Sequence, residues 1–306
     1  MERLYLVTGG PGFIGSHIVE ELIRRGKRVR VIDNLSTGKR ENLHHIAEKI
    51  DFIEADLRDL DVAVKGVRGA DFVLHQAAVP SVPRSIEDPK GVTEHNVIGT
   101  LHILMAARDA NVKRVVYASS SSVYGDSPLL PKEEDFFPSP LSPYAASKLA
   151  GEYYCKVFYQ VYGLETVCLR YFNVFGPKQD PLSPYAAVIP KFIRMALEKK
   201  QLAIYGDGEQ TRDFSFVSNV VNANMLACEV EGVAGETINV GCGEKISLNQ
   251  LVEELRKIID PNLKVKYSPP RPGDVKHSLA SIKKARELLG YKPSVSFTEG
   301  LRKTVA

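Results

Sequence analysis

A glycine-rich turn close to the start of the sequence constrains the fold more than any other feature. Residues 4–8 are a short apolar, β-branched run of the kind that forms a buried parallel strand. They lead directly into the turn at residues 9–15, and a helical pattern follows that ends at Arg25, before Gly26. A strand, a glycine turn and a helix in this order predict the first unit of a dinucleotide-binding α/β domain.

Three glycines of this turn have separate expected functions. Gly9 permits the tight turn, Gly12 lets the backbone approach a pyrophosphate, and Gly15 lets the helix pack closely on the strand. The positive end of the helix then faces the phosphates, next to Phe13 and Ile14. The turn therefore predicts a phosphate-binding site.

An acidic residue at the end of the second strand indicates which dinucleotide binds. The strand at residues 28–33 ends in Asp33, at the distance expected for the acid that accepts hydrogen bonds from the adenosine ribose. Its carboxylate would repel a 2′-phosphate, which favours NAD over NADP. The basic residues Lys39 and Arg40 lie close by and are the one feature that could bind such a phosphate.

The rest of the first half alternates between strand and helix. Further strands are expected at residues 52–57, 72–78, 114–119 and 165–170, with helices at 96–110 and from Pro143 to about Tyr162. This alternation predicts a Rossmann-type doubly wound parallel sheet whose ligands lie beyond the carboxyl ends of the strands. His75 lies within an apolar strand and is expected to be a core histidine with satisfied hydrogen bonds.

The composition of the chain changes after about Arg170, where proline and glycine become frequent. Short helical runs at 189–199, 218–229, 248–259 and 282–289 are separated by brief strands. We expect an NAD-binding domain at residues 1–170 and a smaller α/β cap at 171–306 that binds the substrate, from which the chain can cross back to the sheet.

A hydroxyl, a tyrosine and a lysine suggest the chemistry. The run Ser119–Ser122 follows the fifth strand, and Tyr144 and Lys148 are four residues apart, which places them on one face of a helix. A nearby ammonium favours a tyrosinate, so we expect Lys148 to lower the pKa of Tyr144 from about 10. Tyr144 could then take a proton from a substrate hydroxyl, with Ser120 sharing the hydrogen bond. A Tyr-x-x-x-Lys pair alone is a weak signal, and the upstream glycine turn gives it weight.

Composition excludes several other classes of protein. Of 306 residues, 44% are apolar and 25% charged, and the net charge of +3 comes from interspersed signs. These values give no case for nucleic acid or an anionic membrane as partner. No apolar run approaches membrane-spanning length and no signal-peptide pattern is found, so we expect a cytoplasmic protein. The cysteines form no Cys-x-x-Cys pair and no histidine cluster has metal-ligand spacing, so we expect no metal and reduced, buried cysteines.

With both the glycine turn and the Ser, Tyr and Lys in place, the chain resembles the extended short-chain dehydrogenase/reductase family and, within it, the UDP-hexose 4-epimerases. The resemblance covers essentially the full length. Beyond the residues above it rests on Tyr171-Phe172-Asn173, Val188-Ile189-Pro190, Gln210-Thr211-Arg212-Asp213-Phe214 and Arg271-Pro272-Gly273-Asp274.

The resemblance implies a reaction and a set of binding residues. Tyr144, assisted by Ser120, would remove the C4 hydroxyl proton while hydride passes from C4 to NAD. The 4-keto sugar would then rotate about its diphosphate link, and hydride would return to its other face. Arg212 and Arg271 would bind the diphosphate, Asp274 the UDP portion, and Asn173 the substrate near the diphosphate. Further cofactor contacts are expected from Asn34, Ser36, Thr37, Gly38, Asp56, Leu57, Gln76, Ala77, Ala78, Asn96, Ser119, Lys148 and Tyr171. Further substrate contacts are expected from Val82, Arg84, Ser121, Ser122, Val188, Tyr205 and Ser278.

Related enzymes use the 4-keto intermediate differently. In the resembled family, 4,6-dehydratases have Asp-Glu after the serine, and UDP-glucuronate decarboxylases have Glu. This chain has Ser121 and Ser122 there, which disfavours elimination. A 4,6-dehydratase, a 4-reductase and a non-catalytic NAD-binding sensor remain the alternatives.

The resemblance also bears on the sugar and on assembly. The position that admits or blocks an N-acetyl group corresponds to Ser278, a small residue, and the loop at residues 81–85 resembles that of enzymes for N-acetylated sugars. We therefore expect UDP-GlcNAc and UDP-GalNAc as substrates, with UDP-Glc and UDP-Gal as further possibilities. A homodimer through the helices that follow Asn96 and Tyr144 is what the family suggests.

Overall fold

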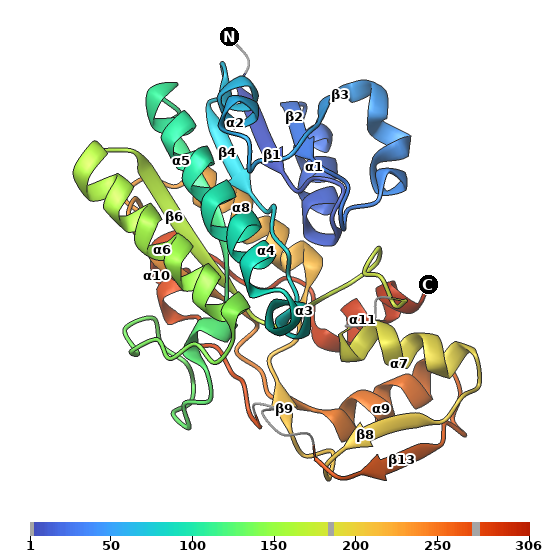
Figure 1. The fold of residues 1–306 in the computed structure, drawn as a ribbon. Helices are drawn as coiled ribbons and strands as arrows, with labels where there is room; N and C mark the ends of the chain where they lie inside the picture. Colours follow the sequence, from blue (N-terminus) through green and yellow to red (C-terminus); the bar gives the residue numbers. More distant parts are fainter. Residues whose placement is uncertain (1–2, 183–186, 271–275) are drawn as a thin grey trace.

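The computed structural model describes residues 3–182, 187–270 and 276–306 of the chain. In this part the chain forms a seven-stranded parallel sheet covered by helices on both faces, with a smaller lobe beneath one end (Figure 1). The strand order, β3-β2-β1-β4-β5-β6-β11, confirms the predicted doubly wound fold. The strands are β1 (Leu4–Thr8), β2 (Arg28–Asp33), β3 (Ile50–Glu54), β4 (Phe72–His75), β5 (Arg114–Ser120), β6 (Glu165–Tyr171) and β11 (Thr237–Val240).

Both faces of the sheet are buried, which explains the continuous apolar runs of its strands. In β1, Leu4 and Leu6 belong to the core on one face, and Tyr5 and Val7 to the core on the other. The helices of the first face are α2 (Leu60–Val67), α5 (Gly99–Asp109) and α6 (Pro143–Tyr162), and those of the second are α1 (Phe13–Arg24) and α8 (Val217–Glu229).

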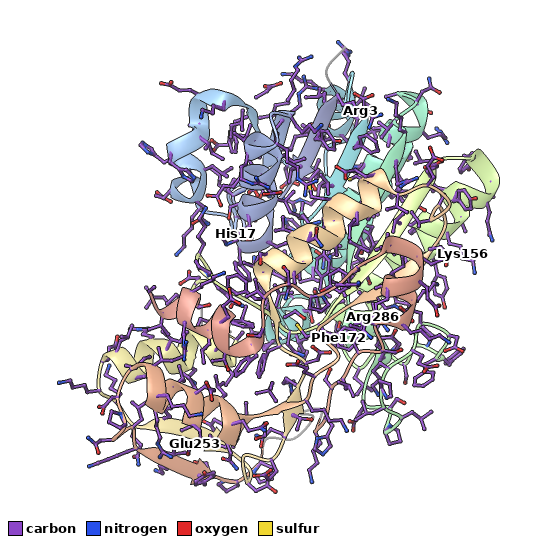
Figure 2. The ribbon with its side chains drawn as sticks, turned by 180° about the vertical axis from the view of Figure 1, so that it is seen from behind. Arg3, His17, Lys156, Phe172, Glu253 and Arg286 are labelled. Atoms are coloured by element: carbon purple, nitrogen blue, oxygen red, sulfur yellow. The ribbon has the colours of Figure 1, made fainter. Side chains whose placement is uncertain are left out.

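The smaller lobe is built around a short parallel strand pair, with helices against it (Figure 1). Figure 2 shows Phe172, which is fully buried, in the interior where the chain leaves the sheet. One apolar core runs on from the sheet into the lobe, so the two are packed together. The elements of the lobe and its junction are β7 (Val174–Phe175), α7 (Val188–Leu197), β8 (Leu202–Tyr205), β9 (Thr211–Arg212), β10 (Ser215–Phe216), β12 (Ile246–Ser247), α9 (Leu248–Ile258), β13 (Val265–Ser268), α10 (Lys283–Leu289) and α11 (Phe297–Val305).

Shorter elements lie in the connections between these strands and helices. They are a 3₁₀ helix at Arg40–Lys49, α3 (Val82–Glu87), α4 (Pro89–Thr93), a π-helical turn at Glu94–Ile98 and a 3₁₀ turn at Ser121–Tyr124.

Several boundaries differ from the prediction. The third strand begins at Ile50 and ends at Glu54, because its neighbour β2 pairs with it only over that length. The fourth strand ends at His75, so Gln76, Ala77 and Ala78 lie in the following loop. Both α8 and β11 come after residue 170 and return to the sheet, and β11 was not among the predicted strands. The division into two domains at residue 170, with a mainly nucleotide-sugar-binding second part, stays a prediction.

Other expectations can be compared with the described residues. His75 is buried between the hydroxyls of Thr8 and Thr100, at 2.7 and 2.9 Å, and burial lowers its pKa to about 3, so it is the satisfied core histidine predicted. All four cysteines are free, and Cys242 alone among them is only partly buried. No described helix is long and apolar enough to cross a membrane. Over the same residues no group of His, Cys, Asp and Glu could hold a metal ion.

The helix α6 begins and ends where the sequence predicts. The Ser142 hydroxyl accepts from the Ala145 N–H at 3.1 Å, Pro143 occupies the first turn, and Gly163 ends the helix at φ +72°. At Gly151 the helix lies directly on the sheet, because a Cβ there would be 2.2 Å from the hydroxyl oxygen of Tyr117.

We expect Gly151→Ala to destabilise the protein, although alanine is the better helix former by about 1 kcal/mol. Tyr117 is 1% exposed, so its ring cannot move away from a new Cβ. The net loss in the free energy of unfolding should be about 2 kcal/mol, measured by urea denaturation. Ala146→Ser on the exposed side of α6 is the control and should cost less than about 1 kcal/mol. Equal stability of wild type and Gly151→Ala would show that Tyr117 can move to accommodate the new Cβ.

Candidate active site

A cavity of about 1250 Å³ lies along the carboxyl ends of the strands, between the sheet and the smaller lobe. Its wall is formed by the loops that follow β1 to β5 and by segments of the lobe. Pockets for one small molecule are typically about 300–1,000 Å³. The cavity is therefore large enough for a dinucleotide together with a second ligand.

The glycine turn forms one end of this cavity. Gly9 has φ +71°, and a Cβ there would lie 2.7 Å from the Ala77 nitrogen. A Cβ on Gly15 would lie 2.1 Å from the Gly9 carbonyl oxygen, whereas one on Gly12 would meet only that oxygen, at 3.1 Å. No side chain caps the N-terminus of α1. The first N–H groups of α1 are thus available to a phosphate, and the predicted cradle for a pyrophosphate fits.

Asp33, the residue expected to bind the ribose, lines the cavity at the end of β2. The Leu35 N–H donates to its carboxylate at 2.6 Å, and burial raises its pKa. Lys39 forms an ion pair with Asp180 at 2.8 Å, and Arg40 pairs with Glu54 and stacks on Phe52. Both basic residues are thus already engaged by acids, which favours NAD over NADP.

Two hydrogen-bonded groups line further parts of the cavity wall. Asn34 donates to Asp56 at 2.8 Å, and the Arg58 guanidinium holds the pKa of Asp56 well below its usual range. Gln76 and Asn224 both contact the Tyr171 hydroxyl, at 3.1 and 2.9 Å. These contacts fix polar groups from three different loops against the same cavity.

The serine, tyrosine and lysine meet at the centre of the cavity. The backbone N–H and the hydroxyl of Ser122 both donate to the Ser120 hydroxyl oxygen, at 3.2 and 2.9 Å. The proton of Ser120 is therefore directed elsewhere, and Ser120 is hydrogen-bonded to Tyr144, which lowers the pKa of the phenol. Lys148 is 4% exposed and its ammonium donates to the Ala118 carbonyl at 3.0 Å.

The expectation that Lys148 makes Tyr144 acidic is wrong for this structure. Burial raises the pKa of Tyr144 by more than the hydrogen bond from Ser120 lowers it. Burial also lowers the pKa of Lys148 to about 8. The physical reason is that both groups lose water on this helix face, and the ammonium is directed to a β5 carbonyl rather than to the phenol.

A buried ion pair lies directly behind these residues. Glu152 follows Lys148 by one turn of α6 and accepts two hydrogen bonds from Arg170, at 2.9 and 2.8 Å. Each side chain is 5% exposed. The Ser119 hydroxyl also donates to Glu152, and Arg170 stacks on the Tyr124 ring. Ser119 is thus held by α6, immediately before Ser120.

Most of the predicted substrate-binding residues also line the cavity. Arg212 donates to the carbonyls of Thr211 and Lys276, which fixes it beside the lobe. Asn173 has a positive φ of +28°. The predicted substrate-binding residues that line the cavity are Val82, Arg84, Ser120, Ser121, Ser122, Tyr144, Asn173, Arg212 and Ser278.

Four predicted contact residues do not line the cavity. Asn96 is buried and its amide binds the Val79 backbone and the Ser147 hydroxyl, so it supports the cavity wall from behind. Gly38 packs against the Asp33 carboxylate, Val188 begins α7, and Tyr205 ends β8. Arg271 and Asp274 lie outside the described residues. Cofactor residues expected from sequence that do line the cavity are Gly9, Gly12, Phe13, Ile14, Gly15, Asp33, Asn34, Ser36, Thr37, Asp56, Leu57, Gln76, Ala77, Ala78, Ser119, Tyr144, Lys148 and Tyr171.

The cavity wall also includes charged residues that the sequence did not single out. Lys178 lines the wall and binds Glu20 of α1, which ties the segment after β7 to the first helix. His277 accepts from or donates to the Thr211 hydroxyl at 3.0 Å, and Lys132 lies on the same wall. These residues lie in loops with no motif, so only the fold brings them to the site.

Comparison with known proteins gives full-length matches. A model of the NAD dependent epimerase/dehydratase family matches residues 5–241. The chain is 45% identical to a UDP-N-acetylglucosamine 4-epimerase from Methanobrevibacter ruminantium, solved with UDP-N-acetylmuramic acid, with a TM-score of 0.95 over 99% of this chain and 97% of that one. A Thermus thermophilus UDP-glucose 4-epimerase, solved with NAD, is 40% identical with a TM-score of 0.90 over 99% and 97%. A UDP-N-acetyl-alpha-D-glucosaminuronate decarboxylase of Bacillus cytotoxicus is 34% identical, and the match covers 100% of this chain and 97% of the relative.

We expect Gly12→Ala to separate dinucleotide binding from folding. The new Cβ meets one carbonyl oxygen at 3.1 Å, so the free energy of unfolding of dinucleotide-free protein should fall by less than about 1 kcal/mol. The methyl group projects where the pyrophosphate is expected, so the Kd for NAD, measured by calorimetry, should rise at least about 10-fold. Gly26→Ala, at a position with open space and φ +69°, is the control that leaves the Kd unchanged. Unchanged affinity in Gly12→Ala would contradict the proposed phosphate site.

Proposed function

The chain belongs to the NAD dependent epimerase/dehydratase family, and we propose that it is a UDP-hexose 4-epimerase that works through a transient 4-keto sugar. NAD is its cofactor, in keeping with the family and with relatives solved with NAD. The observation that carries the proposal is that Ser120, Tyr144 and Lys148 line the same cavity as the glycine turn. A base and a dinucleotide cradle on one cavity are what reversible oxidation of a hydroxyl requires.

The residues of this chain that would hold the cofactor divide into two groups. Gly9, Gly12 and the start of α1 would hold the pyrophosphate, and Asp33 the adenosine ribose. When bound, NAD supplies a site that accepts a hydride from carbon and returns it. Lys148 and Tyr144 lie where the cavity meets the ends of β5 and α6, between this cradle and the residues assigned to the sugar.

We assign proton transfer to Tyr144. Its phenolate takes the proton of the sugar C4 hydroxyl and later returns it to the 4-keto oxygen, so the protein ends the cycle unchanged. The Ser120 hydroxyl, free to donate because Ser122 fills its acceptor side, stabilises the phenolate. Burial opposes ionisation of Tyr144, and the hydrogen bond from Ser120 is the contact that lowers the pKa of the phenol.

The arrangement of acids argues against elimination or decarboxylation as the main reaction. Ser121 and Ser122 occupy the positions where an acid would be needed, and both are neutral. Among the described residues, the carboxylates on the cavity wall are Asp33, Asp56 and Asp180. The first two lie at the adenosine end and the third pairs with Lys39. A 4,6-dehydratase or a decarboxylase is therefore the second candidate, kept because a decarboxylase is among the relatives.

For the sugar, we propose UDP-GlcNAc and UDP-GalNAc, with UDP-Glc and UDP-Gal also accepted. Ser278 is partly buried on the cavity wall, and its N–H donates to the Thr211 carbonyl at 3.1 Å, so a small side chain is held at a fixed place. A relative at 45% identity carries the name UDP-N-acetylglucosamine 4-epimerase. The phosphates would bind at Arg212.

We also propose that the protein is a cytoplasmic homodimer. Apolar side chains are exposed on the outer face of α6, where Tyr153, Val157 and Val161 are 55%, 45% and 66% exposed. A second copy of the chain would cover this face.

The first test is to incubate the purified protein, without added NAD, with UDP-GlcNAc and separately with UDP-Glc. Resolution of the products by NMR at the sugar C4 should show the galacto epimers and no net oxidation. Tyr144→Phe should lower kcat at least about 100-fold, because it removes the base. Tyr267→Phe is the control, since it removes a phenol hydroxyl exposed on the lobe. A 4-keto-6-deoxy product or loss of CO₂ would replace the proposal by the second candidate.

We expect Ser278→Tyr to change the choice of sugar. A large ring at this position should lower kcat/KM for UDP-GlcNAc at least about 10-fold relative to UDP-Glc, because it fills the space proposed for the N-acetyl group. The ratio is measured by the same NMR assay, and Ser278→Ala should leave it unchanged. If Ser278→Tyr does not move the ratio, another residue selects the sugar.

A further inference from the structure

Lys132 is a buried cation on the cavity wall that the proposed reaction does not use. Its residue is 2% exposed, and it lines the cavity. Its backbone is held firmly against the segment that leads to α10: its N–H donates to the Leu279 carbonyl at 2.7 Å, and the Ser281 N–H donates to its carbonyl at 2.8 Å. The Asn239 amide also donates to that carbonyl, at 2.9 Å. The position of Lys132 is therefore fixed by the fold.

The charge of Lys132 is not neutralised by a carboxylate. Its ammonium donates to the Ser127 carbonyl, and no carboxylate of the described residues forms an ion pair with it. Asp126 acts on it only at longer range, and burial lowers its pKa. Burying a charge without an acid partner is costly, and a lysine that only closed a loop could be replaced by a neutral donor.

Lys132 lies at the sugar end of the cavity rather than the cofactor end. Its ammonium binds the loop that begins at Gly125, and its backbone binds the residues that follow Ser278. Gly125 and Ser278 both line the cavity. Lys132 thus connects the loop after the catalytic serines, which its ammonium binds, to the segment after Ser278, which its backbone binds.

We propose that Lys132 forms a subsite for a carbonyl-type oxygen on a substituent of the sugar ring. This inference rests on the proposed function, because it assumes that a UDP-sugar occupies the cavity. An ammonium with only one protein acceptor has two N–H donors left for such an oxygen. Two substituents offer this chemistry: the acetamido group of UDP-GlcNAc and the carboxylate of UDP-glucuronate. The hydroxymethyl group of UDP-Glc offers neither.

The test compares wild type with Lys132→Met, which keeps the length of the side chain and removes its charge. The Kd values of UDP, UDP-Glc, UDP-GlcNAc and UDP-glucuronate are measured by calorimetry; 4-epimers formed during the measurement keep the same substituent. We expect a 10- to 100-fold weaker Kd for UDP-GlcNAc or UDP-glucuronate, the loss of one charge-assisted hydrogen bond. UDP and UDP-Glc should change less than about 3-fold. The sugar that loses affinity identifies the substituent.

Controls separate this subsite from a structural effect and from the proposed function. Lys276→Met changes an exposed lysine nearby that does not line the cavity, and should alter no Kd. Lys132→Gln keeps a donor for Ser127 without the charge and should reproduce the selective loss if Lys132→Met does not fold. Equal weakening of all four ligands, or no weakening, overturns the subsite while leaving the epimerase proposal intact. Failure of wild type to bind any UDP-sugar overturns both.

Discussion

The ion pair between Glu152 and Arg170 joins the three elements on which the chemistry depends. Glu152 is on α6, Arg170 on β6, and the Ser119 hydroxyl that also binds Glu152 is on β5. Both charged side chains are 5% exposed, so removal of either one would leave an unpaired buried charge and destabilise the fold. Because Tyr144, Lys148 and Glu152 repeat every four residues, fixing Glu152 also fixes the side of α6 that faces the sheet. Ser120 and Tyr144 therefore meet because the charges behind them are paired.

The same burial that fixes these residues makes the site costly to maintain. The pKa of Tyr144 is raised and that of Lys148 lowered to about 8, both because protein replaces water around them. Burial therefore disfavours both the phenolate form of Tyr144 and the ammonium form of Lys148. Exclusion of water nevertheless favours catalysis, because a buried base and a buried cation interact more strongly with a polar group that enters the cavity. The hydrogen bond from Ser120 is directed to the atom where negative charge must develop.

The sequence predicted the parts of the site that depend on local backbone geometry. The glycine turn and the helix Pro143–Tyr162 follow from glycine, proline and capping residues, and both are present with the expected bounds. The sign of the pKa shift of Tyr144 was missed, because spacing along a helix gives proximity but not burial or the direction of an ammonium. Asn96 was assigned to the cofactor although its amide is consumed by Val79 and Ser147. Which groups the Asn96 amide binds depends on tertiary contacts, and these cannot be inferred from a local motif.

Charged residues of opposite sign line different parts of the cavity. Asp33 and Asp56 lie at one end, where ribose hydroxyls can donate to carboxylates. Arg212 and Lys132 line the part of the wall contributed by later loops, where phosphates and sugar substituents would need donors. Arg212 reaches it from the lobe, which the continuous core joins to the sheet. This separation of charge would orient NAD and a UDP-sugar end to end in the cavity. The packing of the lobe on the sheet therefore determines which sugar atom faces Tyr144.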